Sequence, residues 1–342
     1  MAHPLPLEPQ ADRQARVTVA IPAYKAEATI RRAVDSVLAQ QGVDLEVVVV
    51  VDGIFDRTVE RLEGYPPSVR VLVNERNSGA QVARNRGLVE ATGEYVLFLD
   101  CDDYLEDQML APLVARMRER DAELGFAPMQ VLKEATGKRR PAIFPAYDSA
   151  DDIFRLWMGH GRVVAPCSLM WRTDFLREIG GWDERVFRAE DREVVIRSIM
   201  RGARFAVSDQ GRGIYVNHDS PDRLTRRPEI LQSSIDVGEI VLATDTEFVS
   251  ERVKREGLAG YFYRIGLLLQ SLGRPDLAAH ALRRARELGR VGPFWHRAAA
   301  TALGLPFRTR LLKMHQTGRP VWFLLALSSL LVRRANAGFA QR

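Results

Sequence analysis

Four continuous apolar runs in the first hundred residues constrain the fold more than any other feature of this sequence. They cover residues 17–21, 45–51, 69–73 and 95–99. Residues 28–41 have helical spacing of apolar side chains. A second helix is predicted at 78–91, with Ser78 as its N-cap and Thr92-Gly93 as its end. Continuous runs separated by helices are typical of parallel strands that are buried on both faces. We therefore predict an α/β fold with a mostly parallel sheet flanked by helices.

Polar side chains follow each of these runs. Tyr24 comes after the first run, Asp52 after the second, and Asn74 and Asn77 after the third. The fourth run ends in Asp100-Cys101-Asp102-Asp103. Since ligands of parallel α/β sheets bind outside the carboxyl ends of the strands, these residues mark a candidate site.

Three carboxylates within four residues repel one another unless a cation lies among them. Oxygen ligands of this kind suit Mg²⁺ or Mn²⁺, ions that commonly bridge to phosphate oxygens. The alternative is a solvated acidic turn ahead of the next helix. We expect an exposed cluster, so that Asp103→Ala would remove activity without harming the fold.

The rest of the chain divides into two regions. Residues 108–228 give a mixed pattern, with helices expected at 109–120 and 194–201 and a short strand at 168–171. After Pro228 the pattern is almost entirely helical, and 262–290 has the small-residue spacing of one tetratricopeptide-like hairpin, although an ordinary helical hairpin fits as well. We predict one domain at 14–228, with halves 14–107 and 108–228, and an all-helical C-terminal region at 229–342.

The charge is distributed unevenly. The net charge is +5, but residues 252–342 hold 17 basic and 3 acidic side chains, and no acid occurs from 288 onward. Such a tail predicts an anionic partner, either nucleic acid or an acidic membrane surface. Residues 321–332 are apolar but too short to span a bilayer, which takes roughly 20 residues. This helix within 303–342 would therefore lie on a membrane, on the domain at 14–228, or on a second subunit of an oligomer.

The location follows from two further observations. The first residues, MAHPLPLEPQ, have no apolar signal-peptide core, and two cysteines exclude a disulfide framework. We expect a cytoplasmic protein, peripheral on the inner face of the plasma membrane if the tail binds lipid.

Short motifs along the chain occur in a fixed order. They are Ile21 to Lys25, Val48 to Asp56, Asn77-Ser78-Gly79, Ala83 to Gly87, Leu99 to Asp103, Gly180 to Glu184 and Glu190-Asp191. In these motifs the sequence resembles the family 2 inverting glycosyltransferases of the GT-A fold, over roughly residues 14–225. The resemblance implies a GT-A-type, Rossmann-like sheet and a sugar transferase.

The resemblance also implies roles for individual residues. In the donor site, Tyr24 would pack against a nucleotide base, Asp52 would accept the imide N–H of that base, and Arg84 would face the diphosphate. Asp102, Asp103 and His218 would hold Mn²⁺ or Mg²⁺, with Asp102 also near the ribose. The remaining donor-binding residues would be Pro22, Ala23, Glu27, Asn77 and Gly79.

On the acceptor side, the resemblance makes Asp191 the general base, supported by Glu190. Trp182 and Asp183 would bind the acceptor. Each role has a structural alternative: Tyr24 as a core-edge aromatic, Arg84 paired with a surface acid, Trp182 simply buried, and Glu190-Asp191 as the first turn of a helix. His218 has a structural alternative as well.

The chain departs from the family pattern after its second strand. Where two acidic or amide residues and Gly-Ser-Thr-Asp are usual, this sequence has Val51-Asp52-Gly53-Ile54-Phe55-Asp56. Val51 removes one polar contact, and Ile54 and Phe55 replace two hydroxyls. Base recognition is therefore the part of the resemblance that this sequence supports least.

The expected function is a metal-dependent, inverting transfer of a sugar from a nucleotide-sugar, in the first place a UDP-sugar, to a glycan or lipid-linked acceptor in cell-surface polysaccharide synthesis. One alternative is a catalytically degenerate domain that binds partners through its helical tail. A nucleic-acid partner is not expected, because the basic region lacks interleaved aromatics. A dehydrogenase would need Gly-x-Gly-x-x-Gly after the first strand, and Pro22-Ala23-Tyr24-Lys25 stands there.

Overall fold

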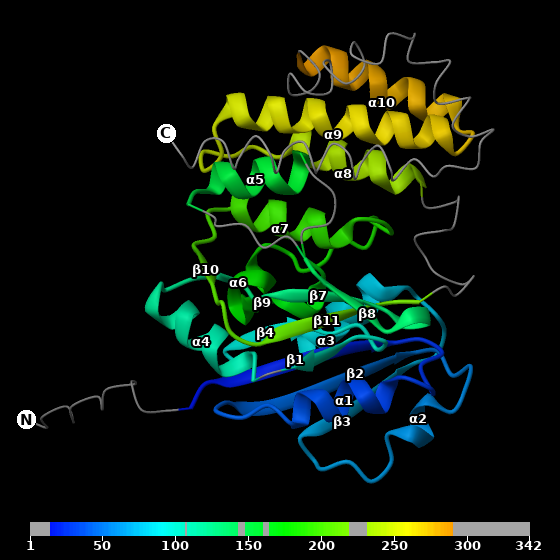
Figure 1. Ribbon diagram of the computed structural model, residues 1–342, viewed down its shortest axis with the longest axis vertical. Helices are drawn as coiled ribbons and strands as arrows, with labels where there is room; N and C mark the ends of the chain where they lie inside the picture. The colour runs from blue at the N-terminus through cyan, green and yellow to red at the C-terminus, as the bar shows by residue number, and fades with distance from the viewer. Residues whose placement is uncertain (1–13, 107, 143–147, 160–163, 219–230, 290–342) are drawn as a thin grey trace, which may run out of the picture. The chain divides into compact units, whose positions relative to one another are not determined.

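The computed structural model describes residues 14–106, 108–142, 148–159, 164–218 and 231–289 (Figure 1). These residues form two compact units. The first takes the described residues up to Ser149 and those of 164–218, and the second takes 150–159 and 231–289. The predicted boundary at 228 lies outside the described residues, as do 303–342 and the apolar segment 321–332. The sequence patterns did not predict that helix 150–159 belongs to the second unit.

A seven-stranded sheet forms the centre of the first unit, in the order β10-β6-β9-β4-β1-β2-β3. Its strands are β1 (Arg16–Ala23), β2 (Asp44–Asp52), β3 (Val69–Asn74), β4 (Tyr95–Phe98), β6 (Leu124–Phe126), β9 (Leu169–Arg172) and β10 (Phe205–Val207). β4, β1, β2 and β3 run parallel, whereas β9 is antiparallel to both β4 and β6. The mostly parallel sheet predicted from the apolar runs is confirmed.

A smaller sheet extends from the acidic segment that follows β4. It has the order β5-β11-β7-β8, with strands β5 (Tyr104–Glu106), β7 (Met129–Lys133), β8 (Lys138–Pro141) and β11 (Arg212–Asn217). β11 ends at Asn217, directly before His218, and β5 begins directly after Asp103. Because β5 and β11 are paired, the sheet brings these two distant segments together.

Six α-helices accompany the sheets in the described part of the first unit. They are α1 (Ile30–Leu38), α2 (Thr58–Arg61), α3 (Ala80–Glu90), α4 (Leu110–Glu119), α6 (Thr173–Glu178) and α7 (Glu190–Met200). One-turn 3₁₀ helices lie at η2 (Glu134–Thr136) and η3 (Pro166–Ser168). Of the predicted stripe on α1, Ile30, Val34 and Val37 are buried and Leu38 is half-buried, and Ala33 is buried as well. α3 packs against β1 and β2 (Figure 1).

Two helix starts differ from the prediction. Ser78 is not the N-cap of α3; Gly79 occupies that position, with a positive φ of 101°. α7 begins at Glu190, four residues before the predicted start at Val194, because polar residues fill its first turn and hide the helix from an apolar pattern. Glu190 and Asp191 therefore lie in the first turn of a helix, as the structural alternative proposed.

The buried carboxylate of Glu46, near the start of β2, binds side chains of β1 and β3. Glu46 accepts hydrogen bonds from Thr18 Oγ1 at 2.6 Å, from the Thr92 backbone N at 2.9 Å, and from Arg70 at 3.2 Å. Burial alone would raise the pKa of Glu46, but these hydrogen bonds outweigh burial and lower the pKa below its ordinary value. The charged form of Glu46 therefore stabilises the folded state.

All the regular secondary structure of the second unit's described residues is helical. It comprises α5 (Ala150–Gly159), α8 (Leu231–Ala243), α9 (Glu251–Ser271) and α10 (Pro275–Leu288). α9 and α10 form a hairpin that turns at Gly273 (φ 75°), and a Cβ on Gly266 would lie 2.7 Å from Leu282 Cγ. The predicted hairpin is thus present, whereas its tetratricopeptide character stays a prediction.

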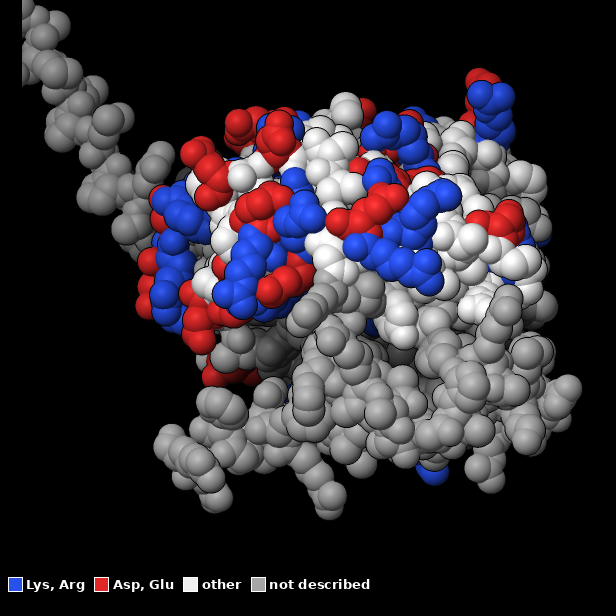
Figure 2. All heavy atoms as spheres, turned by 90° about the horizontal axis from the view of Figure 1, so that it is seen from above, with Lys and Arg blue, Asp and Glu red and all other residues white. Residues whose placement is uncertain are grey.

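Charges on the described C-terminal helices are balanced. Residues 231–289 hold eight acidic and eight basic side chains, and Figure 2 shows both signs side by side on the face seen from above. Ion pairs join Arg284 to Glu239 and Arg274 to Asp276. The excess positive charge of the tail thus lies in 290–342, outside the described residues. No helix in the described ranges is long and apolar enough to cross a membrane.

Candidate active site

The predicted donor residues gather at the carboxyl ends of three neighbouring strands. β4, β1 and β2 are adjacent and parallel, so the segments that follow Phe98, Ala23 and Asp52 leave the same edge of the sheet. Pro22 and Ala23 are buried and pair with Val50 and Val51 of β2. They therefore form a buried part of the carboxyl end of the sheet. The next residue, Tyr24, has the first exposed side chain after them.

Asp52 is buried, and its carboxylate holds the loop that leads into α3. It accepts hydrogen bonds from Gly79 N at 2.8 Å, from Ser78 N at 3.0 Å and from Asn74 Nδ2 at 2.8 Å. The Asn77 side chain also accepts from Gly79 N, at 3.1 Å. Asp52 thus holds the turn that leads into α3, whereas Ser78 was expected to cap that helix. Its contact with a base stays a prediction.

Glu27 ties together the loops after β1 and β2. Its carboxylate accepts from the Arg57 backbone N at 3.2 Å and pairs with Arg57 Nε at 3.3 Å. In return, Glu27 N donates to Asp56 Oδ2 at 2.9 Å, and the Asp56 carboxylate also accepts from Thr58. These bonds fix the spacing between the two loops that carry Tyr24 and Phe55.

Asp102 and Asp103 of the acidic cluster have different partners. Asp102 Oδ2 lies 2.8 Å from His218 Nε2, so β5 and β11 bring two of the predicted metal ligands together. Asp103 is buried, and its Oδ1 accepts from Val216 N of β11 at 2.8 Å. The expectation of an exposed Asp103 is therefore wrong, because this carboxylate is part of the packing between β5 and β11.

Burial raises the pKa values of two residues in this segment. Burial, followed by the nearby charge of Asp100, raises the pKa of Asp102, and contact with His218 opposes that rise. Burial also raises the pKa of the Cys101 thiol, which keeps it neutral and unsuited to nucleophilic attack.

The residues present fit a cation only in part. Among the described residues, no group of three or more His, Cys, Asp or Glu side chains is placed to hold a metal ion. Asp102 and His218 form a pair, however, and Mg²⁺ is commonly held by one or two protein ligands while substrate phosphates complete its shell. The pair is therefore compatible with an ion that arrives with a diphosphate, and the metal stays a prediction.

Arg84 of α3 connects the acidic cluster to α7. Its side chain is 3% exposed, with Nη2 2.7 Å from Asp100 Oδ1 and Nη1 3.4 Å from Glu190 Oε1. Burial opposes its charge, but the carboxylates of Asp100 and Glu190 outweigh burial and raise its pKa. The guanidinium lies 4.5 Å from the centre of the Trp182 ring. Arg84 thus joins the predicted donor and acceptor groups through one buried cation.

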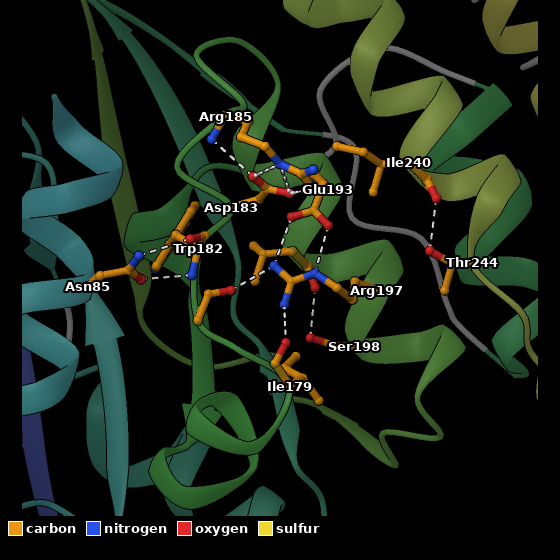
Figure 3. Close-up of polar contacts among 12 residues, drawn as sticks. Asn85, Ile179, Trp182, Asp183, Arg185, Glu193, Arg197, Ser198, Ile240 and Thr244 are labelled. Carbon is orange, nitrogen blue, oxygen red and sulfur yellow. Dashed lines mark hydrogen bonds and ion pairs between the residues drawn. The ribbon is translucent and has the colours of Figure 1, made fainter.

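The same helix fastens the loop that carries the predicted acceptor residues. Asn85 exchanges two hydrogen bonds with the backbone of Trp182, at 2.8 and 2.9 Å (Figure 3). Gln81 Nε2 donates to Val186 O at 2.6 Å. This polar face explains why α3 has buried polar residues and no clear apolar stripe. The sequence motif contained Asn85 and Gln81 lies just before it, but spacing alone gave neither a role.

The two predicted acceptor residues lie in different environments. Trp182 is 1% exposed and packs against Phe98 and Trp171, at ring distances of 5.2 and 6.1 Å. The ring therefore belongs to the core, as its structural alternative proposed. Asp183 pairs with Arg185 at 2.6 Å, which lowers the pKa of Asp183. Contact of either residue with an acceptor stays a prediction.

Contacts of Arg197 hold α7 to the segment that precedes it. Arg197 pairs with Glu193 one turn earlier at 2.6 Å, and it donates to Ile179 O at 2.5 Å and to Gly181 O at 2.6 Å (Figure 3). Asp191, in the first turn, is buried, and its Oδ1 accepts from Arg192 N at 2.8 Å. The first turn of a helix favours a charged carboxylate. Arg197 is a residue that the sequence analysis missed.

Comparisons with known proteins identify a family, several sequences and a structure to which this chain is similar. The model of the family described as Glycosyl transferase family 2 matches residues 18–180, a range that ends before Asp191. The succinoglycan biosynthesis protein ExoO of Rhizobium meliloti (strain 1021) is 29% identical over 264 residues, which cover 73% of this chain and 72% of ExoO. The uncharacterized glycosyltransferase EpsJ of Bacillus subtilis (strain 168) is 27% identical over 226 residues, which cover 62% of this chain and 63% of EpsJ, less than two thirds of its length.

A solved structure is similar in fold. The crystal structure of S. aureus TarS 1-349 in complex with UDP-GlcNAc superposes with a TM-score of 0.62 at 19% identity, covering 85% of this chain and 93% of that one. At this identity the likeness supports the fold alone. The predicted fold class is confirmed by the two sheets and by this neighbour.

Proposed function

Because residues 18–180 of this chain match the model of glycosyl transferase family 2, we propose that the protein transfers a sugar from a nucleoside diphosphate sugar, in the first place a UDP-sugar, to a glycan or lipid-linked acceptor, with inversion. The donor class and the pathway in this proposal are carried over from two proteins to which the chain is similar. ExoO is named for succinoglycan biosynthesis, and TarS was crystallised with UDP-GlcNAc. The product would be a polysaccharide of the cell surface.

One observation carries the proposal. Arg84 contacts both Asp100, which follows β4 at the donor edge, and Glu190, which begins α7 beside Asp191. Asp100 is 16 positions and Glu190 is 106 positions from Arg84 in the sequence, yet both contact its guanidinium. A transferase needs its leaving group and its base within one site, and this contact supports that arrangement.

The proposed reaction is a single displacement. Asp191 takes the proton of an acceptor hydroxyl, whose oxygen attacks the anomeric carbon as the bond from that carbon to the diphosphate oxygen breaks. Glu190, held by Arg84, keeps the first turn of α7 in place. The nucleoside diphosphate leaves toward the edge that carries Asp102 and His218. A divalent cation on that pair would supply positive charge to the leaving group.

The experiment measures release of UDP from UDP-sugars by the full chain, with and without Mn²⁺, and with acceptor glycans. The wild type should release UDP, whereas Asp191→Asn should be slower by about 10²–10⁴-fold. Asp174→Asn is the matched control, because Asp174 is an exposed carboxylate in the first turn of another helix, α6. Equal rates for Asp191→Asn and the wild type would refute the role of the base, and failure to bind any nucleoside diphosphate would refute the proposed function.

A further inference from the structure

Three large apolar side chains stand exposed at the donor edge. Tyr24, which follows β1, is 38% exposed, and Ile54 and Phe55, which follow β2, are 66% and 54% exposed. The two loops that carry them leave neighbouring parallel strands. Exposed apolar groups gathered at the ligand-binding edge of a sheet indicate a contact surface for an apolar or aromatic part of a ligand.

The Phe55 ring has a defined position. It lies 5.3 Å from the Tyr24 ring, edge to face, at an interplanar angle of 70°. It also folds back over Gly53, since a Cβ added there would meet Phe55 Cε2 at 2.3 Å and Asn77 N at 3.0 Å. Gly53 has a positive φ of 87°, so both its conformation and the ring above it require glycine. Phe55 is thus packed on one side while half of its surface remains accessible.

Polar recognition is limited at this place. The Asp52 carboxylate already accepts from Ser78 N, Gly79 N and Asn74 Nδ2. Releasing it to read an imide N–H would break the bonds that start α3. A cation lies beside the ring pair: Lys25 Nζ is 5.4 Å from the centre of the Tyr24 ring. This charge attracts electron-rich rings or phosphate but does not distinguish one base from another.

We propose that Phe55, together with Tyr24, forms a stacking platform for the nucleobase of the donor, so that the base is bound by its aromatic face rather than read by Asp52. The proposal rests on the proposed function, because it concerns the donor of that reaction. Since every base has an aromatic face, stacking tolerates different bases. The platform therefore predicts weak discrimination between uracil and guanine nucleotides.

The test is calorimetric titration of the full chain with UDP and, separately, with GDP. The wild type should bind both, with dissociation constants within about tenfold of each other. Phe55→Ser should weaken both by a similar factor of about 5- to 150-fold, the range expected when one base loses its stacking partner. Phe55→Tyr keeps an aromatic ring and should retain most of the affinity. Val89→Ser, at a 74% exposed apolar site on α3, is the matched control and should change neither constant.

The outcomes separate the two proposals. If the wild type binds neither nucleotide, both the proposed function and the platform fail. If it binds UDP and Phe55→Ser, shown to be folded by circular dichroism, binds UDP as tightly as the wild type, only the platform is refuted. Strong binding of UDP with no binding of GDP would also refute it, since that pattern requires a polar group to read the base.

Discussion

Replacing Asp52 by asparagine tests whether this residue holds a loop or reads a base. The change keeps the size of the side chain but replaces one carboxylate oxygen by an NH₂ group, which cannot accept a hydrogen bond. Oδ2 accepts from Gly79 N and Ser78 N, and Oδ1 accepts from Ser78 N and Asn74 Nδ2. In either orientation of the amide, at least one donor loses its acceptor and faces another donor.

The size of the effect follows from these contacts. A hydrogen bond to a charged group contributes about 1.5–3 kcal/mol. Ser78 is exposed and Gly79 is half-buried, so water reaches a donor that loses its acceptor. One lost bond, with the remaining bonds now made to a neutral group, gives a total of roughly 1.5–3 kcal/mol. For a unit of this size, each kcal/mol lowers Tm by about 2–4 °C, so that Asp52→Asn should melt roughly 3–12 °C below the wild type.

The assay combines thermal unfolding by circular dichroism with UDP titration. Asp44→Asn is the control, because Asp44 is an exposed carboxylate at the opposite end of the same strand. It should change the free energy of unfolding by less than about 0.5 kcal/mol. If Asp52→Asn kept the wild-type Tm but lost UDP binding, Asp52 would contact the base directly, and the loop-holding role would be wrong.

Three further predictions concern other charged side chains. The lowered pKa of Glu46 means that its charge stabilises the fold above its ordinary pKa of 4.5 and that this contribution is lost as the pH falls through the lower folded-state value. The difference in urea unfolding between wild type and Glu46→Gln should therefore be largest at neutral pH and shrink below 4.5; a constant difference would contradict this. Asp103→Ala should destabilise the protein by about 1–3 kcal/mol, since Val216 N loses its buried acceptor, and an unchanged urea midpoint would show that water replaces it. Arg84→Met should cost about 1.5–3 kcal/mol, since the partly exposed carboxylates of Asp100 and Glu190 lose their charged partner, and an unchanged urea midpoint would contradict this.

The backbone of the first unit followed closely from the sequence. The four apolar runs correspond to β1 to β4 within one or two residues, and the helices expected at 28–41, 78–91 and 109–120 are α1, α3 and α4. These elements are predictable because their patterns are local: a continuous apolar run fits a strand that is covered on both faces. The first turn of α7 was missed because its polar residues follow no such pattern.

Side-chain environments were predicted less well than strands. Asp103 was expected to be exposed and is buried, and Trp182 lies in the core, because each contacts elements far away in sequence. A sequence motif identifies a residue as aspartate, but it does not show whether the carboxylate oxygens already accept hydrogen bonds from other parts of the chain. The partners of Asp52, for instance, come from a loop more than twenty positions later.

The sequence by itself determined the parallel sheet, the order of the motifs along it and the set of polar residues at its carboxyl edge, because short-range periodicity fixes strands and helices and strand direction fixes where they end. Only the tertiary structure decided which of those polar groups bind one another. Arg84 meets Asp100 and Glu190, and His218 meets Asp102, because strand pairing and helix packing bring together residues separated by up to 116 positions. Such contacts depend on distance in space, which no local pattern records.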